Sequence, residues 1–330
     1  MVRVFGVGIL IVLVMMLMVL LWFRSKSRPV SIISKMAVSA DTALWAAPDS
    51  GGIASSPDAS LILYGRSLIV STSVYFGPHG GLGRAGNGMN CQNCHLDAGT
   101  RAWGNNYGGV YSTYPKFRER RGAVETISQR VDDCLQRSLN GRALDSTSRE
   151  MRAILAYLKW LGRGIARGQK PKGSGLLALK YLDRAADPGK GEKIYAVKCV
   201  SCHGSSGEGK PDTSGAGYQY PPLWGEHSFT AAAGLYRLSR MAGYVKANMP
   251  FGATWRTPAL TDEEAWDLAA YINSRPRPQK AISKDWPDKA LKPVDHPFGP
   301  YADSFSETQH KYGPFAPILK AHEAALAKKR

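Results

Sequence analysis

The chain has 330 residues, 44% of them hydrophobic, which is enough for two compact domains of about 100 residues each and additional segments. Its formal net charge is +17, from 43 lysines and arginines against 26 aspartates and glutamates. Because no nucleic-acid-binding motif accompanies this charge, we expect no nucleic-acid partner; a small anionic substrate, an acidic redox protein or an anionic lipid surface fits better.

A run of twenty uncharged, mostly apolar residues lies at 4–23. This length matches the hydrocarbon core of a bilayer, so we expect a transmembrane anchor over residues 1–23. Residues 24–60 are rich in Ser, Ala, Gly and Pro and are predicted to form a tether. A cleaved signal peptide is the alternative, with a small-residue site well downstream at 38–40. The basic residues after the span would, by themselves, place the rest of the protein in the cytoplasm.

Two pentapeptides have the spacing Cys-x-x-Cys-His, at 91–95 and at 199–203. This is the attachment sequence for c-type haem, because two thiols three positions apart can bond to one haem while the next histidine ligates its iron. The sequence therefore predicts two covalently bound c-type haems. The attachment residues are Cys91, Cys94, Cys199 and Cys202, and the proximal iron ligands are His95 and His203.

The alternative is a zinc site built from the two cysteine pairs. Zinc ribbons hold their pairs about 15 to 20 residues apart, whereas Cys94 and Cys199 are separated by 105 positions (199 − 94). Haem is therefore favoured. It uses four of the five cysteines and leaves Cys134 as a buried bystander or a working thiol.

Changes in composition divide the rest of the chain. We expect a first domain at 61–165, a glycine-rich linker at 166–175 and a second domain at 176–275. Residues 276–330 are rich in proline and are predicted to form an irregular tail that wraps over the domains.

The two domains have the pattern of a repeat. A helical run precedes each haem motif, at 61–74 and 189–197, and each domain ends in a helix that opens with Thr-x-x-Glu, at Thr147 and at Thr261. The two threonines are 114 positions apart (261 − 147). This order resembles small class I cytochrome c domains, so the predicted fold is mainly α, with two such domains in tandem.

Each haem iron needs a sixth ligand from elsewhere in its domain. In the second domain Met249, followed by a proline, is the favoured candidate, and Met241 and Lys246 are alternatives. The corresponding position in the first domain is Cys134, 115 residues earlier (249 − 134). Arginines lie near Cys134 in the sequence and favour its thiolate form, which binds iron and attacks sulfur. We therefore predict a His95/Cys134 haem and a His203/Met249 haem.

The residues around the first motif carry a more specific resemblance. The run Gly86-Asn87-Gly88-Met89-Asn90-Cys91-x-x-Cys94-His95-Leu96 and the run Arg130-x-x-x-Cys134-Leu135-x-Arg137-Ser138-x-Asn140-Gly141 precede the Met249 domain. This arrangement resembles the dihaem thiosulfate dehydrogenases of bacteria. The resemblance implies oxidation of two thiosulfates to tetrathionate, in some members reversibly, with two electrons passed to an acceptor cytochrome.

Thiosulfate is a dianion, so joining two of them at one site requires positive charge. We predict that Arg120, Arg130 and Ser138 bind the sulfonate oxygens while Cys134 leaves the iron and bonds to the sulfane sulfur. Asn87 and Arg137 are further candidate substrate ligands. The alternative for each arginine is a solvated face or a pairing with a haem propionate.

Two other functions remain open at this stage. One is a membrane-tethered electron carrier with no substrate of its own, and the other is the haem-cysteine subunit of a sulfur-oxidising multienzyme system. The resemblance to bacterial c-type cytochromes implies haem attachment outside the cytoplasm. We therefore expect a periplasmic location, either anchored to the inner membrane or released by cleavage.

Overall fold

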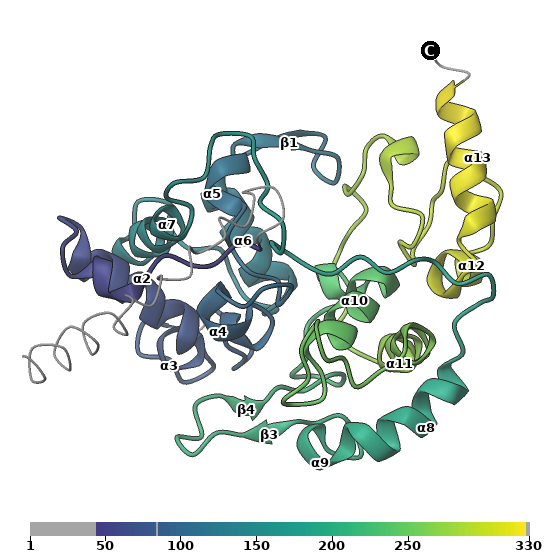
Figure 1. The fold of residues 1–330 in the computed structure, drawn as a ribbon, viewed down its shortest axis with the longest axis horizontal. Coiled ribbons are helices and arrows are strands. Elements are labelled where there is room, and N and C mark those ends of the chain that lie inside the picture. Colours follow the sequence, from purple (N-terminus) through teal and green to yellow (C-terminus); the bar gives the residue numbers. More distant parts are fainter. Residues whose placement is uncertain (1–43, 84, 328–330) are drawn as a thin grey trace, which may run out of the picture. The chain divides into compact units, whose positions relative to one another are not determined.

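The computed structural model describes residues 44–83 and 85–327 (Figure 1). The predicted transmembrane anchor at 1–23 and residues 24–43 of the predicted tether lie outside the described residues. Within the described ranges, no helix is both long enough and apolar enough to cross a membrane.

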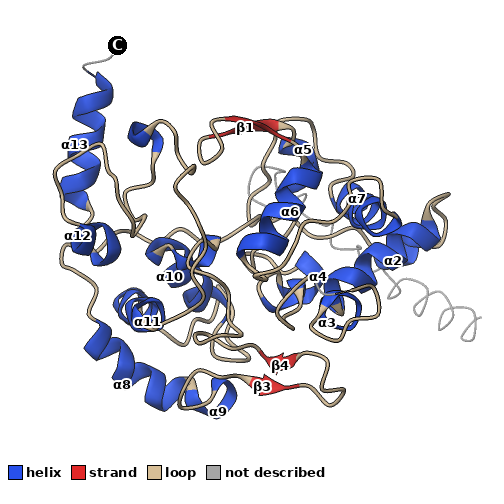
Figure 2. Ribbon diagram, turned by 180° about the vertical axis from the view of Figure 1, so that it is seen from behind, coloured by secondary structure: helices blue, strands red, loops and turns tan. Residues whose placement is uncertain are grey.

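The described chain is mainly helical, and its strands form two short antiparallel pairs (Figure 2). The helices of the first repeat and the segment before it are α2 (Ala59–Val70), α3 (Thr72–Phe76), α4 (Leu96–Gly99), α5 (Val110–Thr113), α6 (Ile127–Arg137) and α7 (Arg149–Leu161). Those of the second repeat are α8 (Pro188–Lys198), α9 (Val200–His203), α10 (Leu238–Asn248) and α11 (Asp262–Ser274), and the tail contains α12 (Glu307–Tyr312) and α13 (Ala316–Ala327).

Short 3₁₀ turns and strands complete the secondary structure. The turns are η1 (Ser50–Ile53), η2 (Cys91–Asn93), η3 (Gly234–Tyr236) and η4 (Lys289–Leu291). Strand β1 (Lys116–Arg118) pairs with β2 (Ala123–Glu125), and β3 (Lys210–Pro211) pairs with β4 (Tyr218–Tyr220).

Each repeat contains the same type of helix crossing: α2 packs on α7 in the first, and α8 packs on α11 in the second. A glycine lies at each crossing: a Cβ added to Gly65 would be 2.0 Å from the backbone oxygen of Ala153, and one added to Gly191 would be 2.0 Å from that of Asp267. No other residue allows the backbones to approach so closely. Ala153 and Asp267 are 114 positions apart (267 − 153), so the packing agrees with the predicted repeat.

The helix caps agree with the prediction in one repeat and differ in the other. Thr261 and Glu264 form the expected capping box, in which each side chain accepts a hydrogen bond from the other residue's backbone N–H. The cap predicted at Thr147 is wrong by one position, because α7 is capped by the hydroxyl of Ser148. The backbone and hydroxyl of Thr147 both donate to Asp145 instead, at 2.8 Å.

Buried apolar side chains form two clusters, one centred on each helix pair. The first contains Tyr157 and Leu161 of α7, and the second contains Trp266 of α11. Leu135 and Leu139, which follow Cys134 closely in the chain, belong to the second cluster although they come from the first repeat. The segment that contains Cys134 therefore packs against the second repeat.

The prediction of an irregular tail is wrong for residues 307–312 and 316–327, which form α12 and α13 (yellow in Figure 1). The Ser306 hydroxyl caps α12 by accepting from the Gln309 backbone N–H. Phe315 and Ile318 are buried in the same cluster as Trp266. Prolines therefore limit the length of these helices without preventing them, because a helix tolerates proline in its first turn.

Candidate functional site

A cavity of about 450 Å³ contains the first haem motif. Cys91, Cys94 and His95 line it together with Cys134, and this volume lies in the range of cofactor and small-molecule sites. Its walls come from three parts of the chain, since Leu235 of the second repeat and Trp286 of the tail also line it. The site is therefore complete only when the repeats and the tail are folded together.

Both motif histidines are held in the orientation that iron ligation needs. Nδ1 of His95 lies 2.5 Å from the Asn105 carbonyl oxygen, and Nδ1 of His203 lies 2.9 Å from that of Pro221. Such a bond places the proton on Nδ1 and leaves Nε2 free for a metal. Burial lowers the pKa of His95 to about 4 and lowers that of His203, so both rings are neutral. These residues fit a c-type haem.

Cys134 lies on α6, whose first turn is fixed by a capping box between Thr126 and Gln129. Leu135, 2% exposed, anchors the helix on the second cluster, while Cys134 lines the cavity shared with His95. The negative charge of a Cys134 thiolate is the largest influence on Arg130, four positions earlier on α6, and raises the pKa of its guanidinium. Cys134 and His95 thus line one cavity, with the Arg130 guanidinium close enough to act on Cys134.

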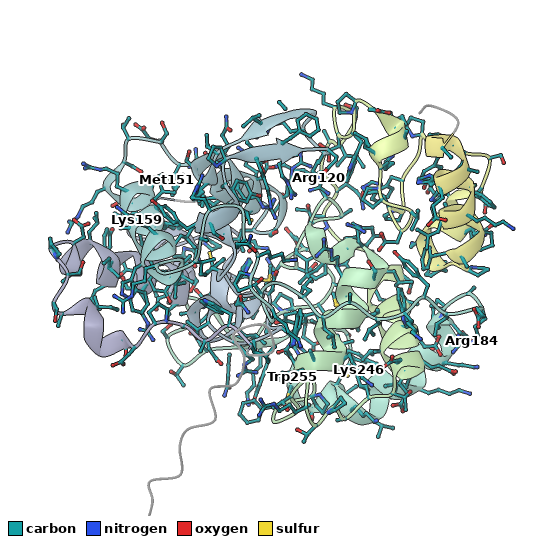
Figure 3. All side chains as sticks on the ribbon, turned by 45° about the horizontal axis from the view of Figure 1, so that its top comes forward. Arg120, Met151, Lys159, Arg184, Lys246 and Trp255 are labelled. Carbon is teal, nitrogen blue, oxygen red and sulfur yellow. The ribbon has the colours of Figure 1, made fainter. Side chains whose placement is uncertain are left out.

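The structure brings together the four residues predicted to be catalytic. Arg120, Arg130, Cys134 and Ser138 all line the cavity. Arg120 (Figure 3) is fixed from the other side: it donates to the Ala232 carbonyl at 3.1 Å, and its guanidinium lies 4.7 Å from the centre of the Trp286 ring. Burial lowers its pKa to about 10, which leaves it charged at neutral pH. The Arg130 guanidinium forms no hydrogen bond or salt bridge with any described residue.

Two other predicted substrate ligands lie outside the cavity lining. Arg137 forms a two-pronged ion pair with Asp285, with both N–O distances at 2.7 Å. The side-chain amide of Asn87 donates to the carbonyls of His227 and Ser228, at 3.0 and 2.9 Å. These groups are already satisfied by the tail and the second repeat, so their contacts join parts of the molecule instead of facing the site.

The second motif has its own candidate sixth ligand. Met249 directly follows α10 and is half-buried against the second cluster. Met241 is 3% exposed and lies inside that cluster. The Lys246 amine (Figure 3) donates to the Leu260 carbonyl at 2.7 Å and pairs with Asp262 at 2.8 Å. Met241 is thus buried in the core and Lys246 is engaged in a salt bridge, whereas Met249 is neither.

Sequence reasoning missed the part of the cavity wall that comes from other segments. Arg237 and Arg240 of the second repeat line the cavity, as does Trp286 of the tail. No local pattern singles them out, because they lie about a hundred or more positions from Cys134 in the chain.

The zinc alternative would need several ligands close together. The described ranges hold no group of three or more His, Cys, Asp and Glu side chains suited to a metal ion.

Comparison with known domain families matches both repeats. Residues 83–166 match the SoxA/TsdA cytochrome c domain, and residues 189–276 match the cytochrome c domain. The predicted fold class of two cytochrome c domains is confirmed. Two such domains carry two c-type haems, as the motifs predicted.

The relatives are thiosulfate dehydrogenases. Those of Psychrobacter arcticus and Stutzerimonas stutzeri are 41% and 38% identical over 62% and 66% of this chain. The match spans 61% of the length of the first protein and 68% of the second. Among solved structures, the "as isolated" thiosulfate dehydrogenase (TsdBA) of Marichromatium purpuratum is similar, with a TM-score of 0.66 and 30% identity over 73% of this chain and 51% of that one. The chain therefore belongs to the thiosulfate dehydrogenase family.

Proposed function

We propose that this protein oxidises two thiosulfates to tetrathionate and passes the two electrons to an acceptor cytochrome. One observation carries the proposal: Cys134, Ser138, Arg120 and Arg130 line the same cavity as the first haem motif. The names of the relatives agree with this activity. In a plain electron carrier Cys134 would only tune the potential of the first haem, and the arginines of that cavity would have no substrate to bind.

The reaction that these residues suit is a sulfur transfer at Cys134. The thiolate bonds to the sulfane sulfur of one thiosulfate, which forms one S–S bond and releases two electrons. The sulfane sulfur of a second thiosulfate then attacks the sulfur bonded to Cys134. The bond to Cys134 breaks, tetrathionate leaves and the thiolate is restored, with no net transfer of protons.

Electrostatics decides whether two dianions can meet at this site. Arg120 and Arg130 supply fixed positive charge, and a guanidinium can donate two parallel hydrogen bonds to a sulfonate group. Arg120 is held in place by Asp285, at 3.6 Å, and by the Ala232 carbonyl. Because the Arg130 guanidinium forms no hydrogen bond or salt bridge with a described residue, its donors are available to the substrate.

The haems supply acceptors for the two electrons, and a thiolate ligand on the first with Met249 on the second would make the second the higher in potential. Under this proposal electrons leave the protein through the Met249-ligated haem, and the sulfur chemistry takes place at Cys134.

The periplasmic location, with residues 1–23 as an anchor or a cleaved signal, stays a prediction. Cell fractionation with an antibody to the C-terminal tail tests it.

The Cys134→Ala variant tests the proposed activity. We expect thiosulfate-dependent reduction of an acceptor cytochrome to fall by at least about 1,000-fold, as for loss of a nucleophile. Ser128→Ala, on the same helix but outside the cavity lining, is the control and should keep full activity. If Cys134→Ala retains the wild-type rate, the protein is an electron carrier and the sulfur chemistry proposed here is wrong.

A further inference from the structure

Arg240 is a basic residue of the second repeat that faces the site of the first. It lies in the first turn of α10 and lines the cavity that contains Cys134. Its guanidinium forms no hydrogen bond or salt bridge with any residue that the structure describes. Arg237, just before the same helix, is by contrast bound to the buried carboxylate of Asp295. Arg237 is thus a structural residue, whereas Arg240 has free donors.

The charge of the cavity makes an anion the natural partner of those donors. Seven lysines and arginines line the cavity, whereas Glu119 is the single carboxylate among the described lining residues. Arg118 and Arg120 already pair with Glu125 and Asp285, at 3.4 and 3.6 Å. Burial, with the nearby charge of Arg237, lowers the pKa of Arg240. The carboxylate of Asp295 acts in the opposite direction, so the feature that suits an anion is the set of unused donors of Arg240, an exposed side chain at the cavity wall.

The proposed reaction needs two anion sites. Arg130 and Cys134 are four positions apart on α6 and therefore lie on the same face of that helix, as one site for the thiosulfate that bonds to Cys134. The second thiosulfate must approach from another wall of the cavity. Arg240 lies on such a wall, contributed by α10.

We propose that Arg240 binds the sulfonate group of the second thiosulfate, and hence the far sulfonate of bound tetrathionate. This inference rests on the proposed function and deepens it. The second repeat would then complete the substrate site as well as carry electrons away. The other anion of suitable chemistry is a propionate of the first haem, and the experiment separates the two.

The test measures tetrathionate binding to the oxidised dihaem protein by isothermal titration calorimetry, without turnover. We expect Arg240→Met to weaken binding by about 10-fold or more, the effect of losing a hydrogen-bonded charge. Arg240→Lys should lose less, because the charge remains. Lys159→Met is the matched control: it removes the same charge from an exposed position on α7, well away from Arg120 in Figure 3, and should bind tetrathionate like the wild type.

The midpoint potential of the first haem, measured without substrate, identifies the anion. Arg240→Lys keeps the positive charge, so this potential stays at the wild-type value if Arg240 contacts only the substrate, and it shifts if the guanidinium binds a propionate. The proposal is overturned if the tetrathionate affinity of Arg240→Met stays within about twofold of the wild type, a difference too small for a lost charged hydrogen bond, or if the potential of Arg240→Lys is shifted. Should Arg240→Met fail to incorporate both haems, Arg240→Gln is judged by the same criteria.

Failure of this inference is distinguishable from failure of the proposed function. If the wild-type protein does not reduce an acceptor with thiosulfate, the proposed function is wrong. If the wild type is active and Arg240→Met binds tetrathionate equally well, the assignment of Arg240 alone is wrong.

Discussion

Whether a single side chain in this protein can bind a ligand depends on the hydrogen bonds, ion pairs and packing contacts that it already makes. Arg130 and Arg137 lie seven positions apart on α6, yet Arg137 is held by Asp285 while Arg130 has free donors beside Cys134. Met241 and Met249 differ in a similar way, since the core surrounds one and leaves the other half-buried. Residue type alone makes these two arginines and two methionines candidate ligands. Their contacts show that Arg137 and Met241 have structural roles and leave Arg130 and Met249 as functional candidates.

Met249→Leu tests the proposed sixth ligand of the second haem. We expect the altered protein to lose the methionine signature in the reduced spectrum and to bind carbon monoxide at that haem, because the thioether is removed. The matched control is Met241→Leu, a swap of similar volume in the core that costs less than about 1.5 kcal/mol and leaves the spectrum unchanged. The opposite pattern in the two variants would assign Met241 as the ligand.

At the scale of elements, the contacts between α2 and α7 and between α8 and α11 fix the helix that precedes each haem motif against the last helix of its repeat. Gly65 and Gly191 lie at the contact points, where a side chain has no room. The motif follows the glycine-bearing helix in both repeats, directly after α8 in the second. A substitution that separates α8 from α11 should therefore also displace the second haem motif, which follows α8 directly.

Substitutions at two glycines of α8 should have different effects. Gly191→Ala places a Cβ 2.0 Å from the Asp267 oxygen, and we expect a loss of about 1 to 3 kcal/mol in the free energy of unfolding from overpacking. Gly189→Ala meets only the Asp187 carboxylate, at 3.3 Å, and should change stability by less than about 1 kcal/mol. Denaturant unfolding followed by circular dichroism measures both. Equal losses would contradict the proposed role of the crossing.

At the scale of the whole molecule, the tail connects the repeats to the site. Asp285 binds Arg137 and Arg120 of the first repeat, and Asp295 binds Arg237 of the second. Both carboxylates are buried, at 6% and 0% exposure. Buried carboxylates need such partners, so the tail is part of the folded unit.

Asp285→Asn should affect both stability and substrate binding. We expect a loss of about 2 to 4 kcal/mol, because the partly buried Arg137 loses the closer of its two carboxylate partners and keeps only Asp133, at 3.7 Å. We also expect a higher KM for thiosulfate, because Arg120 loses its ion pair and is held only by the Ala232 carbonyl. Asp288→Asn makes the same charge change three residues later at an exposed position and serves as the control. An unchanged KM in Asp285→Asn would show that Asp285 does not position Arg120.

The Asp295 contacts also predict a pH dependence. Burial alone would raise the pKa of Asp295, but Arg237 and the Ser239 hydroxyl and backbone N–H outweigh it and leave the pKa below its usual value. A lowered pKa in the folded state stabilises the fold above the unfolded value of about 3.9, and this stabilisation is lost as the pH falls through the folded value.

We therefore expect the stability difference between wild type and Asp295→Asn to be constant between about pH 7 and pH 5 and to shrink below about pH 4. Unfolding free energies measured across this range give the result. A difference of the same size at about pH 3 as at pH 7 would show that folding does not lower the pKa of Asp295.

Several errors of prediction share one physical origin. The cap at Thr147 was displaced because Asp145 competes for its hydrogen bonds, and α12 and α13 form in the tail because Phe315 and Ile318 gain burial on the second cluster. Local propensity predicts neither, since each depends on a competing or distant partner.

The sequence by itself determined the two haems and predicts their attachment cysteines and proximal histidines, because Cys-x-x-Cys-His places all these groups within one short stretch of chain. It also nominated Cys134, through the repeat. Only the tertiary structure decided which charged groups face the cavity. Arg240 approaches it from α10, and Asp285 holds Arg137 away from it. Those residues are more than a hundred positions from the residues they serve, and contacts over such separations depend on how the repeats and the tail pack.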